Sequence, residues 1–138
     1  MHEGQTGNNE KQNSPHPSCC IISKNTLFVS DLGTDTIYAY TLCLPGSKSL
    51  SLQKESSLIL PSAGPKFISA STNSSYPFIY VSCSLDSSIY VISYSNNKLE
   101  TVVAYRVSSN INCLPTQMVC LNDLLFMCNK GDSRLIVF

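Results

Sequence analysis

The chain of 138 residues is long enough for one domain with a hydrophobic core. Nine Lys and Arg residues balance nine Asp and Glu residues, so the formal net charge is zero, which argues against nucleic acid or an anionic membrane as a partner. Charged residues make up 13% of the chain, against about 25% in an average soluble domain. Short polar residues with Tyr, Ile, Val and Phe predict strands and turns rather than exposed helices.

The chain shows no stretch of the ~20 apolar residues that a membrane helix needs, and residues 1–13 lack the apolar run of a signal peptide. Its seven cysteines are an odd number without a C-x-x-C pair. We therefore expect reduced thiols in a cytoplasmic protein, buried where they lie in apolar runs: Cys19, Cys20, Cys120 and Cys128. The spacing of Cys113, Cys120 and Cys128 matches no zinc-ligand pattern, so we expect neither a metal nor an organic cofactor.

Three segments of the chain align with one another over fourteen residues without a gap. They are LFVSDLGTDTIYAY from Leu27, IYVSCSLDSSIYVI from Ile79 and LFMCNKGDSRLIVF from Leu125. Each consists of an apolar strand, a short polar loop and a second apolar strand, which is the pattern of a β-hairpin. The sequence therefore predicts hairpins over residues 27–40, 79–92 and 125–138.

More of the repeat surrounds these hairpins. A proline and a short apolar run come before each one: Pro15 with residues 19–22, Pro65 with 67–70, and Pro115 with 118–121. The prolines place His16, Lys66 and Gln117 at the start of the first strand of each unit. Further strand-like runs follow the first two hairpins at residues 50–55 and 101–107. The unit is thus four strands, the composition of a propeller blade.

We therefore predict an all-β fold, a fragment of a β-propeller with three blades in an open arc. The units cover about residues 15–63, 64–114 and 115–138 of one partial domain. A β-sandwich could also supply short strands at these intervals, but it would not repeat one motif three times. Propellers typically have about four to eight blades, each of which buries its faces against its neighbours. We expect the arc to expose two apolar blade faces and to self-associate through them.

Six short motifs in the chain resemble, in order, those of the seven-bladed β-propeller lactonases. This family includes the bacterial-type 6-phosphogluconolactonases and the fungal carboxy-muconate lactonizing enzymes. The matching motifs are His2-Glu3-Gly4 for H-x-G, KQNSPHPS from Lys11 for R-Q-x-x-P-H-x-H, DLGTD from Asp31 for D-L-G-x-D, GPKF from Gly64 for G-P-R-H, YVSCSL from Tyr80 for Y-V-x-N-E-L, and CNKG from Cys128 for S-N-R-G. In that register Met1 falls near the family's fourth blade.

The resemblance implies hydrolysis of a sugar lactone, as in the pentose phosphate pathway, with a lactone or an anionic sugar as the ligand. The family's His, Arg and Glu side chains line its central pocket, and of these His16 is retained. Ser18 replaces a histidine, Lys66 and Lys130 replace arginines, and Ser84 replaces the glutamate. We expect His16 to be the catalytic base and Lys66, Lys130 and Ser18 to bind substrate. Because Ser84 cannot transfer protons as a carboxylate does, we expect impaired catalysis.

A function of another class stays open, namely a catalytically decayed propeller that acts as a ligand-binding or protein-binding module. His16 lies between two prolines and can be a turn residue, while Lys66 and Lys130 can be solvated loop residues. The acidic residues that recur near the hairpin turns are expected to cap those turns rather than to act in catalysis. They are Asp31, Asp35, Asp86 and Asp132.

Overall fold

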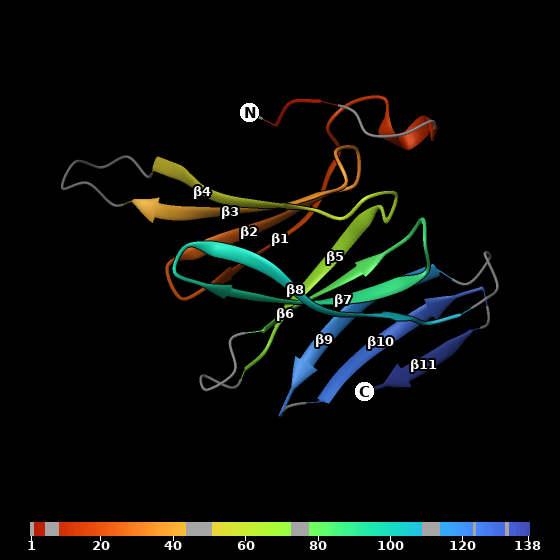
Figure 1. Ribbon diagram of the computed structural model, residues 1–138. Coiled ribbons are helices and arrows are strands. Elements are labelled where there is room, and N and C mark those ends of the chain that lie inside the picture. Colours follow the sequence, from red (N-terminus) through yellow and green to blue (C-terminus); the bar gives the residue numbers. More distant parts are fainter. Residues whose placement is uncertain are drawn as a thin grey trace.

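The computed structural model describes residues 2–4, 9–43, 51–72, 78–108, 114–122, 124–131 and 133–138 (Figure 1). These residues form three antiparallel β-sheets that follow one another along the chain, preceded by one 3-10 turn, η1 (Glu10–Gln12). The predicted all-β fold, a partial propeller, is confirmed. Within the described part of the chain, no helix has the length and apolar character needed to cross a membrane.

Each sheet is an up-and-down meander in which every strand pairs with the next one in the sequence. We call the three sheets blades 1, 2 and 3. Blade 1 contains β1 (Pro17–Ser23), β2 (Thr26–Asp31), β3 (Thr36–Cys43) and β4 (Ser51–Ile59). Blade 2 contains β5 (Pro65–Ala70), β6 (Phe78–Cys83), β7 (Ser88–Ser95) and β8 (Lys98–Arg106). Blade 3 contains β9 (Leu114–Leu121), β10 (Leu124–Lys130) and β11 (Arg134–Val137).

The three blades are arranged as a fan, with their first strands β1, β5 and β9 next to one another (Figure 1). The predicted hairpins are found as β2–β3, β6–β7 and β10–β11, at equivalent places in the three blades. Residues at one repeat position therefore point the same way in every blade. This arrangement brings polar residues near the starts of the first strands together on one side of the three blades.

The turn between the second and third strand of each blade repeats its backbone conformation. Asp35, Ser87 and Ser133 hold the same place in this turn, with φ angles of 51°, 58° and 55°. Short polar side chains can stabilise a left-handed backbone through local hydrogen bonds, whereas β-branched side chains are strained in it. The polar loops of the three sequence repeats therefore reverse the chain with the same turn conformation.

Asp35 also connects blade 1 to the segment that enters blade 2. Its buried carboxylate accepts hydrogen bonds from the backbone N–H of Gly64 at 2.8 Å and of Ser62 at 2.9 Å. The backbone carbonyl of Asp35 accepts a third bond, from the N–H of Leu60 at 2.7 Å. One turn residue of blade 1 thus holds the connection that leads to β5.

The prediction that aspartates cap the hairpin turns is confirmed at two positions. Asp31 accepts from the backbone N–H of Thr34 at 3.1 Å, and Asp86 from that of Ser88 at the same distance. The hydroxyl of Tyr90 also donates to Asp86, at 3.2 Å. Burial and the neighbouring Asp86 charge raise the pKa of Tyr90 to about 12, so it remains a neutral donor. Asp35 does not cap its hairpin turn, because its carboxylate accepts from the connection between β4 and β5, and Asp132 lies outside the described residues.

Each junction between blades combines an apolar layer with one serine hydrogen bond. Between blades 1 and 2 the hydroxyl of Ser30 donates to the carbonyl of Lys66 at 3.0 Å. Between blades 2 and 3 Ser82, at the same repeat position, donates to the carbonyl of Thr116 at 3.1 Å. The apolar layers include Phe28, Ile37, Ile68 and Ile79 at the first junction and Ile89, Met118, Leu125 and Met127 at the second. Each such side chain contributes about 1.5–3 kcal/mol when fully buried.

The first strand of blade 1 begins two residues later than the sequence repeat suggests. The observed register pairs Pro17 with Asp31, Pro65 with Cys83 and Pro115 with Asn129. Pro17, and not Pro15, is therefore the counterpart of the other two prolines. Ser18 corresponds to Lys66 and Thr116, while His16 precedes the strand. A shift of two residues keeps every side chain on the same face of a strand, so the apolar pattern cannot detect it.

The cysteines differ from expectation in their burial. Five described cysteines have free thiols, and of these Cys83 and Cys120 are buried and Cys19 is half-buried. Cys20 and Cys128 are exposed, so the expectation that they are buried is wrong. They lie on the first and the last blade, on the faces that no other blade covers. Cys113 lies outside the described residues.

Replacement of Asp35 with alanine should lower the free energy of unfolding by about 2–3 kcal/mol, because two backbone N–H groups lose their acceptor. Asp35→Asn keeps one acceptor oxygen and should lose less. Urea unfolding followed by circular dichroism measures the effect, with the exposed Glu100→Gln as the control. The role assigned to Asp35 would be contradicted if Asp35→Ala were as stable as Glu100→Gln.

Candidate functional site

A cavity of about 230 Å³ lies on the side of the blades where the strands of the β2–β3 and β6–β7 hairpins are joined by their turns. Residues before and on β1, on β5, in the two turns and at the start of β9 form its wall. The lining residues are Lys11, His16, Ser18, Leu32, Lys66, Ser84, Leu85 and Leu114. Four of the five site residues expected from the sequence therefore share one cavity.

The backbone of His16 is fixed by the turn of the neighbouring hairpin. Its N–H donates to Oδ1 of the buried Asp31 at 2.7 Å, and its carbonyl accepts from the N–H of Leu32 at 3.1 Å. The same Asp31 oxygen caps the turn at Thr34. Both the N–H and the carbonyl of His16 are thus hydrogen-bonded. The residue is nevertheless exposed, and it lines the cavity.

A glycine in this turn allows the chain before β1 to come close. A Cβ atom on Gly33 would lie 1.8 Å from the carbonyl oxygen of Ser14 and 2.8 Å from the backbone nitrogen of His16. Any larger residue would therefore displace the segment that carries His16. Gln12, which is buried, fastens the same segment by donating its side-chain amide to the carbonyl of Leu32 at 3.2 Å.

Two lysines bring positive charge to the cavity. Lys66 lies on β5, and its ammonium stands over the ring of Phe67 at 5.4 Å from the ring centre, a cation–π contact. Lys11 lies in η1, next to the anchored Gln12. Neither lysine forms an ion pair within the described residues. Both ammonium groups can therefore neutralise a bound anion.

Neither Ser84 nor its neighbour Cys83 is set up as a nucleophile. The N–H of Ser84 donates to the carbonyl of Gly64 at 2.9 Å, and its hydroxyl lies 3.4 Å from the same oxygen. No hydrogen bond joins Ser84 to His16 among the described residues. Burial, and then the charges of Asp86 and Asp35, raise the pKa of the Cys83 thiol well above its usual range, so it stays protonated.

No carboxylate lines the cavity in the part of the chain that the structure describes. Asp31 and Asp35 are buried near it, but their oxygens accept backbone N–H groups. The second oxygen of Asp31 contacts Nδ1 of His2 at 2.5 Å, and the ring of His2 stacks on Tyr38. The described His, Cys, Asp and Glu residues do not gather into a group of three that could hold a metal ion. Acid–base chemistry in the cavity would therefore depend on His16.

Lys130 and Gln117 are placed elsewhere. Lys130 is exposed at the end of β10 and pairs with Leu114 of β9. Leu114 lines the cavity, whereas Lys130 does not. Gln117 lines a hollow on the outer face of blade 3. Lys11 was not among the site residues expected from the sequence, although it stands at the arginine of the R-Q-x-x-P-H-x-H motif that the segment resembles. That alignment was the signal that could have identified it.

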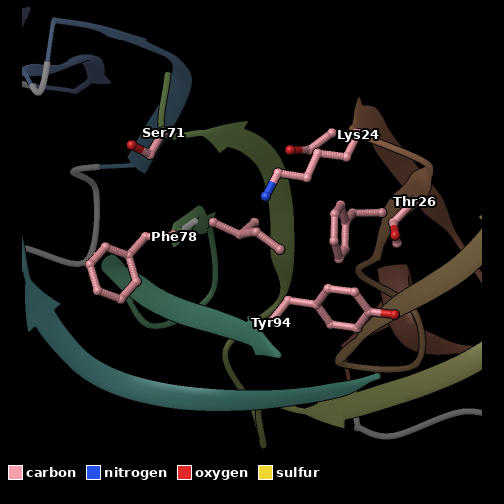
Figure 2. A pocket seen from close by; sticks show the side chains of 8 residues that line it. Lys24, Thr26, Ser71, Phe78 and Tyr94 are labelled. Atoms are coloured by element: carbon pink, nitrogen blue, oxygen red, sulfur yellow. The ribbon is translucent and has the colours of Figure 1, made fainter. Parts of the chain in front are cut away.

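A second pocket, of about 120 Å³, lies between blades 1 and 2 at the opposite end of β2 (Figure 2). The rings of Phe28 and Tyr94 meet edge to face in it, with their centres 5.1 Å apart, and Lys24 lies at its edge. Its described lining contains neither an imidazole nor a carboxylate. It therefore lacks the base that lactone hydrolysis requires, and the first cavity is the candidate site.

Comparison with known proteins identifies the family. The model of a lactonase family, described as a seven-bladed β-propeller, matches residues 1–138, the whole chain. No curated protein matches the sequence. Solved structures do match, at sequence identities of 17–20%.

Three of these solved structures show how much of a propeller the chain represents. A protein from Lactobacillus plantarum has a TM-score of 0.79 at 17% identity, with 100% of this chain and 45% of that chain covered. A protein assigned as a 6-phosphogluconolactonase from Bacteroides uniformis has a TM-score of 0.80 at 19% identity, with 100% and 41% covered. The periplasmic gluconolactonase of Pseudomonas aeruginosa has a TM-score of 0.75 at 20% identity, with 99% and 40% covered.

The chain thus spans less than half the length of the solved structures that it matches. The likeness in fold covers all three blades, and the family model covers the segments that hold the cavity residues. The chain belongs to the seven-bladed β-propeller lactonase family.

Proposed function

We propose that the cavity binds an anionic sugar lactone of the 6-phosphogluconolactone class, and that this chain by itself holds the ligand without appreciable hydrolysis. One observation carries the proposal: Lys11, Lys66 and His16 share a cavity whose described lining contains no carboxylate. The described lining thus supplies cationic groups suited to a lactonase site but no acidic one.

The lining matches the parts of a phosphorylated or carboxylated sugar. Lys11 and Lys66 supply positive charge for the anionic end of the ligand. The hydroxyl of Ser18 donates to the carbonyl of His16 at 3.0 Å, so its oxygen remains able to accept a bond from a sugar hydroxyl. Leu32 and Leu85 offer an apolar wall to the face of the sugar ring.

Hydrolysis of a lactone needs a base to activate water and a donor or cation for the carbonyl oxygen. His16 is the base that the cavity offers, and where one of the two lysines holds the anionic end, the other can act on the carbonyl oxygen. Within the described residues no hydrogen bond orients the His16 ring, since the bonds of His16 are made by its backbone. Loss of one acid–base group typically reduces the rate by about 10²–10⁴. Hydrolysis by this chain is therefore expected to stay at background.

The wall of the cavity comes from three blades, whereas the similar structures are more than twice as long. Further blades would enclose the ligand, exclude water and improve its orientation. Lactone hydrolysis by a full ring, with a place in carbohydrate metabolism, is therefore part of the proposal. So is a cytoplasmic location, which the five free thiols support, although the similar gluconolactonase of Pseudomonas aeruginosa is periplasmic.

Binding should depend on the ammonium group of Lys66. In isothermal titration with 6-phosphogluconate, a stable product of the reaction, Lys66→Ala should weaken binding about tenfold, because a charge-assisted contact is lost. Lys66→Arg should retain most of the affinity. The control is Lys98→Ala, since Lys98 is exposed at the β7–β8 turn and pairs with Glu100. Equal losses for the Lys66→Ala and Lys98→Ala variants would show that this cavity is not the site.

A carboxylate at position 84 should restore part of the missing chemistry. The unmodified chain should open 6-phosphogluconolactone no faster than background, whereas Ser84→Glu should exceed background at least tenfold, because it supplies a proton-transfer group to the cavity that His16 lines. Ser84→Gln has the same size without the charge and should stay at background. Turnover is measured by titrating the acid released.

The double variant with His16→Ala should lose the gain of Ser84→Glu. Rapid turnover by the unmodified chain, abolished by His16→Ala, would contradict the proposal of binding without appreciable hydrolysis.

A further inference from the structure

One buried carboxylate connects the cavity with a histidine outside it. Asp31 is 0% exposed, and its two oxygens have different partners. Oδ1 accepts from the backbone N–H of His16 at 2.7 Å and from that of Thr34 at 3.1 Å. Oδ2 lies 2.5 Å from Nδ1 of His2. Because a carboxylate accepts hydrogen bonds and does not donate them, Nδ1 of His2 is the donor of this contact.

The backbone of His16 in turn holds two other residues of the cavity wall. Its carbonyl accepts from the N–H of Leu32 at 3.1 Å and from the hydroxyl of Ser18 at 3.0 Å. His16, Leu32 and Ser18 all line the cavity. The positions of three lining residues therefore depend on how firmly Asp31 holds the N–H of His16.

The imidazole of His2 is itself fixed by packing against blade 1. Its ring stacks on that of the buried Tyr38, with the ring centres 3.8 Å apart, and the His2 side chain is only 10% exposed. The hydroxyl of Tyr38 lies 3.3 Å from that of Thr34, and the ammonium of Lys54 stands 4.7 Å from the centre of the Tyr38 ring. His2 is not among the described residues that line the cavity, so it can act on the site only through Asp31.

This pair of carboxylate and imidazole does not recur with the repeat. Cys83 and Asn129 occupy the repeat position of Asp31 in blades 2 and 3. Cys83 offers a buried neutral thiol, and the buried amide of Asn129 has no hydrogen-bond partner among the described residues. The serine bonds between blades, by contrast, are present at both junctions. A feature found only beside His16 is better explained by the site than by the general needs of the fold.

We propose that His2 is a positioning residue of the candidate site: its Nδ1–H holds the Asp31 carboxylate in the orientation that fixes the backbone of His16 at the cavity. The inference deepens the proposed function and rests on it, since it concerns the same cavity. The terminal torsion of an aspartate side chain is broad and roughly two-fold, so a carboxylate bound through one oxygen can rotate. A buried acceptor without its donor is also costly. Without His2, Asp31 should therefore turn toward other donors and release His16.

Two variants separate the hydrogen bond of His2 from the packing of its ring. His2→Phe keeps an aromatic ring on Tyr38 but has no donor, whereas His2→Asn keeps a donor N–H near the place of Nδ1 but has no imidazole ring. Amide hydrogen exchange followed by NMR should show that His2→Phe lowers the protection of the His16 amide about tenfold. His2→Asn should retain most of that protection. The internal control is the amide of Ser88, which donates to Asp86 in blade 2.

Binding of 6-phosphogluconate should follow the same order. In isothermal titration His2→Phe should weaken binding about fivefold, because the wall around His16 is no longer held in one arrangement. His2→Asn should bind almost as tightly as the parent. Urea unfolding of both variants separates this effect from a loss of overall stability, since rescue by asparagine requires the donor and not the ring.

The outcomes that would overturn the inference are distinct from a failure of the proposed function. Unchanged protection of the His16 amide in His2→Phe would overturn it, even where 6-phosphogluconate binds. So would a loss in His2→Asn that His2→Phe does not share, which would assign His2 to ring packing, and so would equal losses at His16 and Ser88, which would indicate general destabilisation. A parent chain that does not bind 6-phosphogluconate would contradict the proposed function, while exchange of the His16 amide would still decide whether His2 positions it.

Discussion

A single blade of this protein buries its faces only where another blade lies against them. Ile37 in blade 1 is fully buried because blade 2 covers it, whereas Leu135, at the same position in blade 3, is largely exposed. The polar part of the junction obeys the same constraint. Ser30 and Ser82 find a carbonyl acceptor on the next blade, and at the third such position the chain has Cys128, a residue that makes weaker hydrogen bonds.

The junction also determines the geometry of the candidate site. The hydroxyl of Ser30 holds the carbonyl of Lys66, so the bond that joins blades 1 and 2 also fixes the backbone from which the Lys66 ammonium extends. Asp35 holds the N–H of Gly64, and the carbonyl of Gly64 accepts a bond from the N–H of Ser84 in the cavity wall. The distance between the groups that would bind a ligand is therefore set by blade packing. Variants in the junction should alter ligand binding even where they do not touch the cavity.

Much of this structure could be predicted from the sequence, because the repeat is gapless over each hairpin. The hairpins, the four-stranded unit and the convergence of Lys66 and Ser84 follow from one motif used three times. His16 lies before the repeat position of Lys66, and its bonds to Asp31 and Leu32 hold it at the cavity. The start of β1 could not be predicted, since a shift of two residues preserves the alternation of faces. The exposure of Cys20 and Cys128 depends on which blades have neighbours, which no local pattern encodes. The approach of Lys11 depends on the close contact at Gly33, a tertiary feature.

The serine bond at each junction uses a main-chain carbonyl as its acceptor, and this has a consequence for evolution. A carbonyl is present whatever residue occupies the position, so the acceptor side tolerates any substitution, and the donor side needs only a small hydroxyl. The apolar layer likewise accepts Phe28 in one blade and Tyr80 in the next. A duplicated unit would inherit both halves of the fit and could join the array without compensating changes. The fold itself is retained in structures that share only 17–20% of their residues with this chain, at TM-scores of 0.75–0.80.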